Sequence, residues 1–192
     1  MLSARSAREQ AAPRPKATSA LRVLIRVAML GAVAFVLMYA EFILPGFPTF
    51  LQYDPSDVPT LIGGFAMGPV AGALVAGVKA TLFFLSGKDE AGAIGTAANL
   101  TTSLAFVITA SLVYARLHTK RGALLGLGAG VASMVAVMAV LNYYAFLPAY
   151  GVPAEGLIPL VKTTVLFNLV KGLLNSGLTF LVYKKMSPLL HL

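Results

Sequence analysis

The stretch LVKTTVLFNLVKGLLNSGLTFLVY, residues 160–183, is long and apolar enough to cross a membrane as a helix. An α-helix turns by about 100° per residue, so its polar side chains fall within one narrow stripe. The stripe consists of Thr164, Asn168, Lys171, Asn175 and Thr179. A charged amine inside a membrane helix is costly and usually faces a partner, a cavity or a ligand. The stretch therefore predicts a binding site within a membrane helix bundle.

The composition supports an integral membrane protein. Of the 192 residues, 58% are hydrophobic and 11% are charged, and the mean hydropathy is +0.82. A soluble domain carries about 25% charged residues. The net charge of +8 comes from basic residues that flank the apolar runs, which is a membrane-topology signal and does not indicate nucleic-acid binding.

Metal and disulfide sites are not expected. The chain contains no cysteine, which excludes disulfides and thiol-ligated metals. Its two histidines, His118 and His191, lie at the edges of predicted spans rather than in a ligand cluster.

Six apolar segments predict an all-α domain with six membrane helices over residues 21–192. They are residues 23–44, 60–67, 70–85, 93–115, 122–147 and 160–183. The first is too long for the apolar core of a signal peptide. Residues 1–20 are basic and lack apolar periodicity, and we expect them to form a mobile cytoplasmic tail.

The placement of basic residues predicts the orientation of the chain in the cell membrane. Lysine and arginine are concentrated in residues 1–26, 116–121 and 184–185. Since positive charge favours the cytoplasmic side, we expect both termini to be cytoplasmic. The Pro- and aromatic-rich loops 45–59 and 148–159 then face outward. Their aromatic residues are typical of an interfacial belt and are also suited to stacking on a flat ring.

Lys171 is the strongest candidate for ligand binding. We expect no acidic side chain at its depth, because Glu41 lies nearer the outer end of its own helix. A ligand rich in carbonyl oxygens would then accept its hydrogen bonds. The alternative is that Lys171 and its asparagine neighbours only bond neighbouring helices.

Asn142 and Asn168 are expected at a similar depth near the outer face. Each amide offers one acceptor and two N–H donors, which suits the edge of a uracil- or pteridine-like ring. Helix capping or interhelical bonding is the alternative for Asn142.

Lys79 and Asn99 are weaker candidates for the same cavity. Lys79 could instead pair with Glu41 or extend toward the membrane surface, and Asn99 could serve helix packing. In the first outer loop, Asp54 and Asp57 are suited to accept hydrogen bonds from hydroxyl groups of a polyol. For Asp57 we favour a role as the cap of the second helix, a role that Ser56 could share.

Catalytic motifs are missing from the sequence. It contains no G-x-x-x-x-G-K-[ST] phosphate loop and no H-E-x-x-H zinc motif. We therefore expect a protein that is not an enzyme and does not bind ATP by itself. A self-sufficient secondary transporter remains an alternative, although the two halves are dissimilar and no deep acidic residue is expected.

Three segments resemble the riboflavin-specific substrate-binding subunits of energy-coupling factor (ECF) transporters. They are AMLGAVAFVLMYAEFILPGFPTFLQYDPSDVPTLIGGFAMGP (28–69), LNYYAFLPAYG (141–151) and FNLVKGLLNS (167–176). The resemblance extends from about residue 21 to residue 183. It implies a six-helix membrane domain that captures riboflavin at its outer face, with riboflavin as transported ligand and no cofactor.

The resemblance also implies where the ligand binds. In the family the isoalloxazine ring lies between the first outer loop and the outer ends of helices four to six. The matching positions here are Asn142, Asn168 and Lys171, with Leu51, Gln52 and Tyr53 in the loop. Another vitamin or precursor, of the pteridine or thiamine class, is the alternative ligand; an unpaired Lys171 would repel cationic thiamine.

The resemblance further implies partner proteins. The small-residue motif on the first helix that meets the membrane coupling subunit, an EcfT-like protein, matches Ala28 and Ala32. Two cytoplasmic ATPase subunits would complete the transporter. Internal helix packing is the alternative for this pair of alanines.

Overall fold

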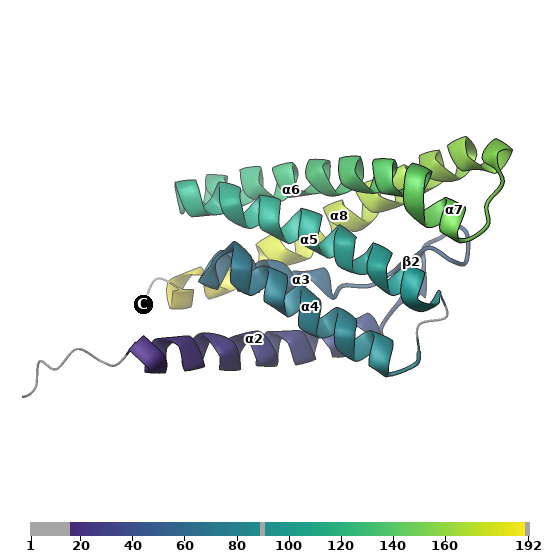
Figure 1. Ribbon diagram of the computed structural model, residues 1–192. Coiled ribbons are helices and arrows are strands. Elements are labelled where there is room, and N and C mark those ends of the chain that lie inside the picture. The colour runs from purple at the N-terminus through teal and green to yellow at the C-terminus, as the bar shows by residue number, and fades with distance from the viewer. Residues whose placement is uncertain (1–15, 89–90, 191–192) are drawn as a thin grey trace, which may run out of the picture.

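The computed structural model describes residues 16–88 and 91–190 as a bundle of helices (Figure 1). Most of the segment predicted as a tail, residues 1–15, lies outside the described residues. The first helix already begins at Lys16, so the last residues of that segment are helical.

Six helices within these ranges correspond to the six predicted segments. They are α2 (Lys16–Met38), α3 (Asp57–Met67), α4 (Pro69–Leu85), α5 (Gly92–Leu117), α6 (Lys120–Leu141) and α8 (Ala154–Leu190). Two short pieces, the π-helix η1 (Asn142–Phe146) and α7 (Leu147–Ala149), continue α6. Four of the apolar helical stretches, residues 20–38, 92–117, 120–149 and 154–183, are long enough to cross a membrane.

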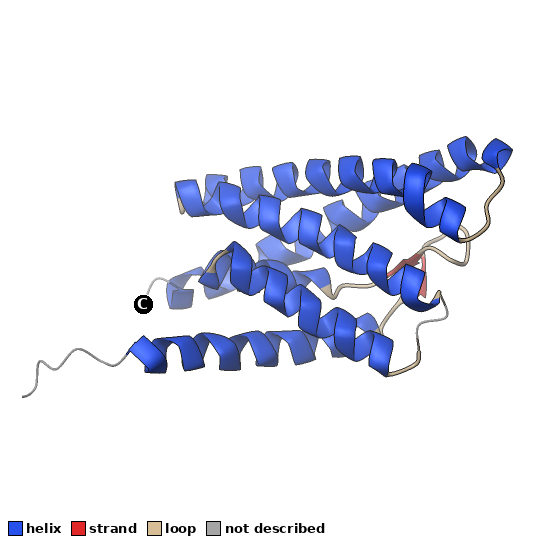
Figure 2. Ribbon diagram, viewed as in Figure 1, coloured by secondary structure: helices blue, strands red, loops and turns tan. Residues whose placement is uncertain are grey.

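The end of the first helix differs from the prediction. The helix ends at Met38 rather than at residue 44, and the chain continues into a small hairpin of β1 (Phe42–Ile43) and β2 (Gln52–Tyr53) (Figure 2). The strands are antiparallel, with Phe42 opposite Tyr53. Pro45 disfavours a helical conformation for the residue before it, which apolarity alone did not reveal.

The start of the last helix also differs. We expected a loop up to Pro159, because proline usually interrupts a helix interior. Instead α8 begins at Ala154 and accommodates Pro159 in its second turn. The connection from α7 to α8 is consequently only four residues, 150–153.

Helix α3 has 11 residues and therefore rises roughly 17 Å, about half the thickness of the hydrocarbon core. It ends at Gly68, whose φ of 95° suits glycine, and Pro69 starts α4 directly afterwards. In Figure 1 the chain from β2 runs into the bundle before α3 begins. The residues that precede α3 are thus carried into the protein interior.

The apolar core lies between α3, α5, α6 and α8. It includes Leu61, Phe65, Phe106, Leu127 and Met134. Close approach of α6 to α5 requires glycine, because a Cβ on Gly126 would lie 2.6 Å from the carbonyl oxygen of Ala110. Glycine at this position therefore allows α6 to pack closely against α5.

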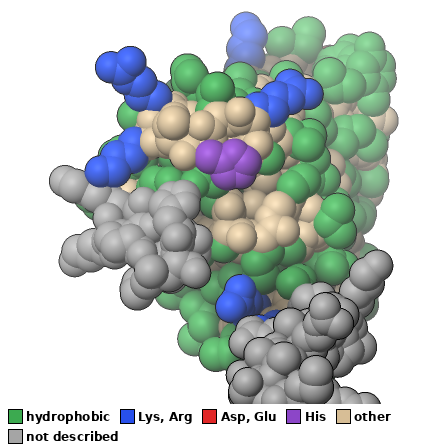
Figure 3. Space-filling model, turned by 90° about the vertical axis from the view of Figure 1, so that its left-hand side faces the viewer, with side chains coloured by type: hydrophobic (Ala, Val, Ile, Leu, Met, Phe, Trp, Pro, Cys, Tyr) green, Lys and Arg blue, Asp and Glu red, His purple; other side chains and the backbone are tan. Residues whose placement is uncertain are grey.

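The two ends of the bundle differ in character. The start of α2 and the end of α8 lie at the same end, and the β-hairpin and α7 lie at the other (Figure 1). Lysine and arginine side chains stand on the face at the terminal end, and no described acidic side chain is visible there (Figure 3). The turn between α5 and α6 contributes Arg116, Lys120 and Arg121, all exposed.

Candidate ligand-binding site

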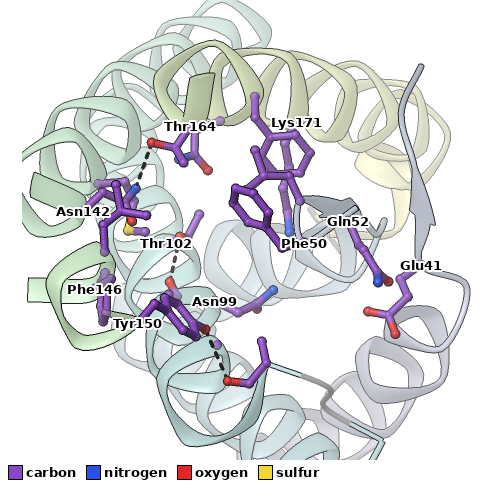
Figure 4. Close-up of a pocket in the computed structure, with 18 of the residues that line it drawn as sticks. Glu41, Phe50, Gln52, Asn99, Thr102, Asn142, Phe146, Tyr150, Thr164 and Lys171 are labelled. Atoms are coloured by element: carbon purple, nitrogen blue, oxygen red, sulfur yellow. Dashed lines mark hydrogen bonds between the residues drawn. The ribbon is translucent and has the colours of Figure 1, made fainter. Parts of the chain in front are cut away.

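A cavity of about 840 Å³ lies at the hairpin end of the bundle (Figure 4). This volume is typical of a site for a small organic ligand. The walls come from the end of α2 and the hairpin, the loop 49–54, the start of α5, the η1–α7 segment and α8. Segments distant in sequence thus converge on one space.

The η1 segment places Asn142 in the cavity wall. The backbone N–H of Leu147 bonds to the carbonyl of Asn142, five residues earlier, which is the widened π-type turn. The side-chain amide of Asn142 donates to the hydroxyl of Thr164 on α8 at 3.2 Å. Phe146, one turn further along, lines the same wall. We predicted a similar depth for Asn142 and Asn168, and both residues line this cavity.

Helix α8 contributes the polar stripe that opened the sequence analysis. Thr164, Asn168 and Lys171 all line the cavity and are buried. Phe167, from the same helix, adds an apolar ring to the lining and contacts Phe47 edge-on, with 5.4 Å between ring centroids. One helix therefore supplies amide, hydroxyl, ammonium and aromatic groups to a single wall.

The hairpin side of the cavity is polar as well. Glu41 and Gln52 lie beside one another in Figure 4, across from Asn142 and Thr164. Lys88 forms an ion pair with Glu41 at 3.4 Å and also lies over the ring of Tyr39. These contacts connect the loop after α4 to the chain between α2 and the hairpin.

Asn99 on α5 presents an unsatisfied acceptor in the cavity wall. Its Oδ1 atom is buried and has no hydrogen-bond partner among the described residues. A buried acceptor of this kind costs free energy unless another group supplies a donor. If the Asn99 side chain turns its Oδ1 atom toward the cavity, a ligand with an N–H or O–H group can supply it.

Lys171 has an acidic partner. Its ammonium donates to Oδ2 of Asp54 at 2.8 Å, and both side chains are buried. The expectation that no acid lies at the depth of Lys171 was wrong, because the loop before α3 enters the bundle and brings Asp54 inward.

The charge state of Asp54 follows from its neighbours. Burial raises the pKa of the Asp54 carboxyl, but the ammonium groups of Lys171 and Lys79 outweigh burial and hold the pKa well below its ordinary value. Asp54 is therefore ionised at neutral pH. It also accepts hydrogen bonds from the backbone N–H and the hydroxyl of Ser56.

A second buried ion pair lies behind the first. The ammonium of Lys79, with 0% of its side chain exposed, donates to Asp57 Oδ1 at 2.6 Å and to the Ser56 hydroxyl at 2.7 Å. Ser103 also donates to Asp57. Ser56 thus joins the two ion pairs into one neutral network that connects α8, α3, α4 and α5.

Two expectations are corrected by this network. Asp57 does not cap α3: Ser56 occupies the N-cap position, and the Asp57 carboxylate binds Lys79 and Ser103 instead. Lys79 does not pair with Glu41, which binds Lys88, and its side chain does not extend to the membrane surface. Short α3 begins deep in the bundle, where its first acidic residue meets the lysine of α4.

Comparison with known proteins identifies the family. Residues 22–183 match the family described as "ECF transporter, substrate-specific component". The chain belongs to this family.

Similar proteins support the assignment. The chain is 34% identical over 174 residues to "Riboflavin transporter RibU" of Staphylococcus aureus (strain TCH60), covering 87% of this chain and 91% of that protein. It is 32% identical over 177 residues to "Riboflavin transporter FmnP" of Bacillus subtilis (strain 168), covering 88% and 93%. A solved structure described as "Structure and mechanism of the S component of a bacterial ECF transporter" matches with a TM-score of 0.79 and 34% identity, covering 88% and 97%.

This ECF substrate-specific component is a transporter subunit and not an enzyme. Its candidate site contains six of the nine residues expected from the sequence to bind ligand. They are Leu51, Gln52, Asn99, Asn142, Asn168 and Lys171.

The other three residues lie beside the cavity rather than in its lining. Lys79 binds Asp57. The Tyr53 hydroxyl donates to Oδ1 of Asn175 at 3.0 Å, and the Asn175 amide donates to the backbone carbonyl of Asp54 at 3.4 Å. Burial, followed by the nearby Asp54 charge, raises the pKa of Tyr53, so its hydroxyl keeps its proton. These side chains fix the loop 49–54 against α8.

Sequence reasoning missed the role of Asp54 in this component. A signal was present: two lysines within apolar helices, and two aspartates three residues apart in the loop before a short helix. Matching the two buried cations to the two acids would have suggested buried pairs, since a lone buried charge is very costly.

Ala28 and Ala32 lie on the outer surface of α2. Both are exposed, whereas Val27 and Ala34, on another side of this helix, are buried in a cluster with Val75 of α4. The alternative that these alanines serve internal packing does not fit their exposure. The surface remains open to lipid or to a partner subunit.

Proposed function

We propose that this ECF substrate-specific component captures riboflavin at the outer face of the cell membrane for uptake by an ATP-driven transporter. The observation that carries the proposal is the convergence of Asn142, Asn168 and Lys171 on one cavity of about 840 Å³. The names of the relatives, both riboflavin transporters, agree with this ligand.

The cavity chemistry suits the two halves of riboflavin. Asn142 and Asn168 offer amide donors and acceptors to the alternating polar edge of the isoalloxazine ring. Lys171 offers N–H donors to a ring carbonyl, and the aromatic lining packs against the ring faces. Glu41 and Gln52, on the hairpin side, are suited to bind hydroxyl groups of the ribityl chain.

Two arguments from the sequence against other functions no longer hold. Thiamine was disfavoured because an unpaired Lys171 would repel it, yet Asp54 neutralises Lys171. A secondary transporter was disfavoured because no deep acid was expected, yet Asp54 and Asp57 are both buried. The proposal is supported instead by membership of the ECF family and by the similarity to riboflavin transporters.

A titration of the purified protein tests the ligand. Riboflavin fluorescence should be quenched in a saturable way, because the ring enters a dry, aromatic cavity. Thiamine added in excess should not release the flavin. Absence of both quenching and calorimetric heat with riboflavin would reject the proposal, and displacement by thiamine would favour the alternative vitamin.

The partners and orientation form part of the same proposal. The exposed alanine pair on α2 supports docking of an EcfT-like coupling subunit, and two cytoplasmic ATPases would supply the energy. The basic residues at the terminal end support an orientation with both termini in the cytoplasm. The apolar exterior contacts membrane lipid, and no nucleic-acid partner is proposed.

A further inference from the structure

The two buried ion pairs of the network resemble each other closely, but only one reaches the cavity. In the first pair, Asp54 of the loop before α3 binds Lys171 of α8 at 2.8 Å. In the second pair, Asp57 at the start of α3 binds Lys79 of α4 at 2.6 Å. Asp54 and Lys171 line the cavity, whereas Asp57 and Lys79 do not. The first pair therefore has a possible role in binding that the second lacks.

We propose that Asp54 is a positioning residue that holds the ammonium of Lys171 in the orientation needed to bind the ligand ring. The proposal rests on the proposed function, since it takes a flavin ring as the group that Lys171 meets. Asp54 acts through Lys171.

The geometry of an ammonium explains why such a residue is needed. Lysine carries its charge on a flexible four-carbon chain with three N–H donors. One donor is directed at Asp54, which fixes the nitrogen and orients the other two. Since the side chain of Lys171 is only 5% exposed, the oriented donors face protein and cavity rather than bulk water.

Asp54 is itself held in place from three directions. Its carboxylate accepts from the backbone N–H of Ser56 at 3.0 Å and from the Ser56 hydroxyl, and its backbone carbonyl accepts from Asn175. Asn175 in turn is bonded by Tyr53. A carboxylate fixed in this way can hold the Lys171 ammonium in one position.

Asp54 also sets the charge of the cavity wall. Together with Lys171 it forms a neutral unit, so a neutral ring with carbonyl acceptors can approach without leaving a buried net charge. Removing the carboxylate would leave a buried ammonium without its counter-charge, which would change its position or its protonation.

The experiment compares Asp54→Asn with the matched control Asp57→Asn, in full-length purified protein. Both changes remove one buried carboxylate from the same network, so both are expected to lower the unfolding temperature. Asp54→Asn should weaken riboflavin binding about tenfold or more and shift the visible absorption bands of the bound flavin, since a cation near a ring carbonyl alters them. Asp57→Asn should leave these bands at their wild-type positions.

A double-mutant cycle adds the decisive readout. If Asp54 acts through Lys171, adding Asp54→Asn to Lys171→Met should cause little further loss of affinity, because contacting residues are non-additive. Fully additive losses, or equal spectral shifts in the two aspartate variants, would overturn the proposal.

Two further outcomes keep the test decisive. If Asp54→Asn does not fold, Asp54→Glu replaces it, because this change keeps the charge but displaces it by one methylene. Altered absorption bands or weaker riboflavin binding in Asp54→Glu support the proposal. Wild-type absorption bands together with wild-type affinity overturn it. Failure of wild-type protein to bind riboflavin at all would reject the proposed function itself, which is a separate result.

Discussion

At the scale of single residues, the site depends on charges that are buried together. Lys171 is tolerated inside the bundle because Asp54 meets it at 2.8 Å, and Lys79 is tolerated because Asp57 meets it at 2.6 Å. Burying such pairs is costly, and replacing them with apolar residues is often neutral or stabilising in other proteins. The presence of the Asp54–Lys171 pair in the cavity wall is therefore better explained by ligand binding than by stability.

Asn99 gives a prediction with opposite effects on binding and on stability. Its Oδ1 atom is buried without a partner, so Asn99→Ala should leave the unliganded protein equally stable or more stable. If riboflavin supplies the missing donor, the same change should weaken binding by about 0.5–1.5 kcal/mol. Fluorescence titration and thermal unfolding measure the two effects.

The control for Asn99 is Thr101→Val on the same helix. The Thr101 hydroxyl bonds to the carbonyl of Ala97 and does not line the cavity, so riboflavin affinity should stay unchanged. An Asn99→Ala protein that binds as tightly as wild type would show that the ligand does not use this acceptor.

At the scale of elements, the short helix α3 determines the site. Because it begins inside the bundle, the chain before it carries Asp54 and Asp57 to the depth of the two lysines. The break at Gly68-Pro69 was evident from the sequence, and so were the long apolar helices. The hairpin and the inward path of the loop were not, since they depend on contacts between distant segments.

Glycines in α6 provide a test of helix packing. A Cβ on Gly126 would lie 2.6 Å from the Ala110 carbonyl oxygen, whereas a Cβ on Gly128 would meet nothing within 4 Å. Gly126→Ala should therefore lower the unfolding temperature in detergent by pushing α6 from α5. Gly128→Ala should leave it unchanged or raise it, because alanine favours a helix over glycine by about 1 kcal/mol. Equal effects of the two changes would contradict the packing of α5 against α6.

At the scale of the whole molecule, the binding cavity and the exposed surface of α2 are separate features. The cavity is lined by Met38 at the end of α2, whereas Ala28 and Ala32 lie earlier in this helix, on its exposed side, and do not line the cavity. Sequence reasoning found six of the cavity residues, because helical periodicity and family motifs mark them. It missed Asp54 as the partner of Lys171, because no local pattern shows which loop residue enters a bundle.

The separation predicts that transport can be lost while binding is kept. Changing both Ala28 and Ala32 to Trp should block close approach of a coupling subunit and abolish riboflavin uptake by cells. The purified variant should still bind riboflavin with wild-type affinity, since neither residue lines the cavity.

The control for uptake is Leu125→Trp, at a side chain on α6 that is 61% exposed. It should reduce neither uptake nor binding. Full uptake by the double alanine variant would exclude docking at this surface, and joint loss of binding and folding would assign the alanines to the structure of the subunit.

The most direct test of the central claim is a riboflavin titration of the wild-type protein beside Asn168→Ala, read by flavin fluorescence. Wild-type protein should quench riboflavin saturably, with one ligand per chain. Asn168→Ala should keep its thermal stability within a small margin but bind about tenfold more weakly, as expected for a loss of ~1.4 kcal/mol. An unchanged affinity in the folded variant, or no saturable quenching by the wild-type protein, would contradict the assignment of this cavity as the riboflavin site.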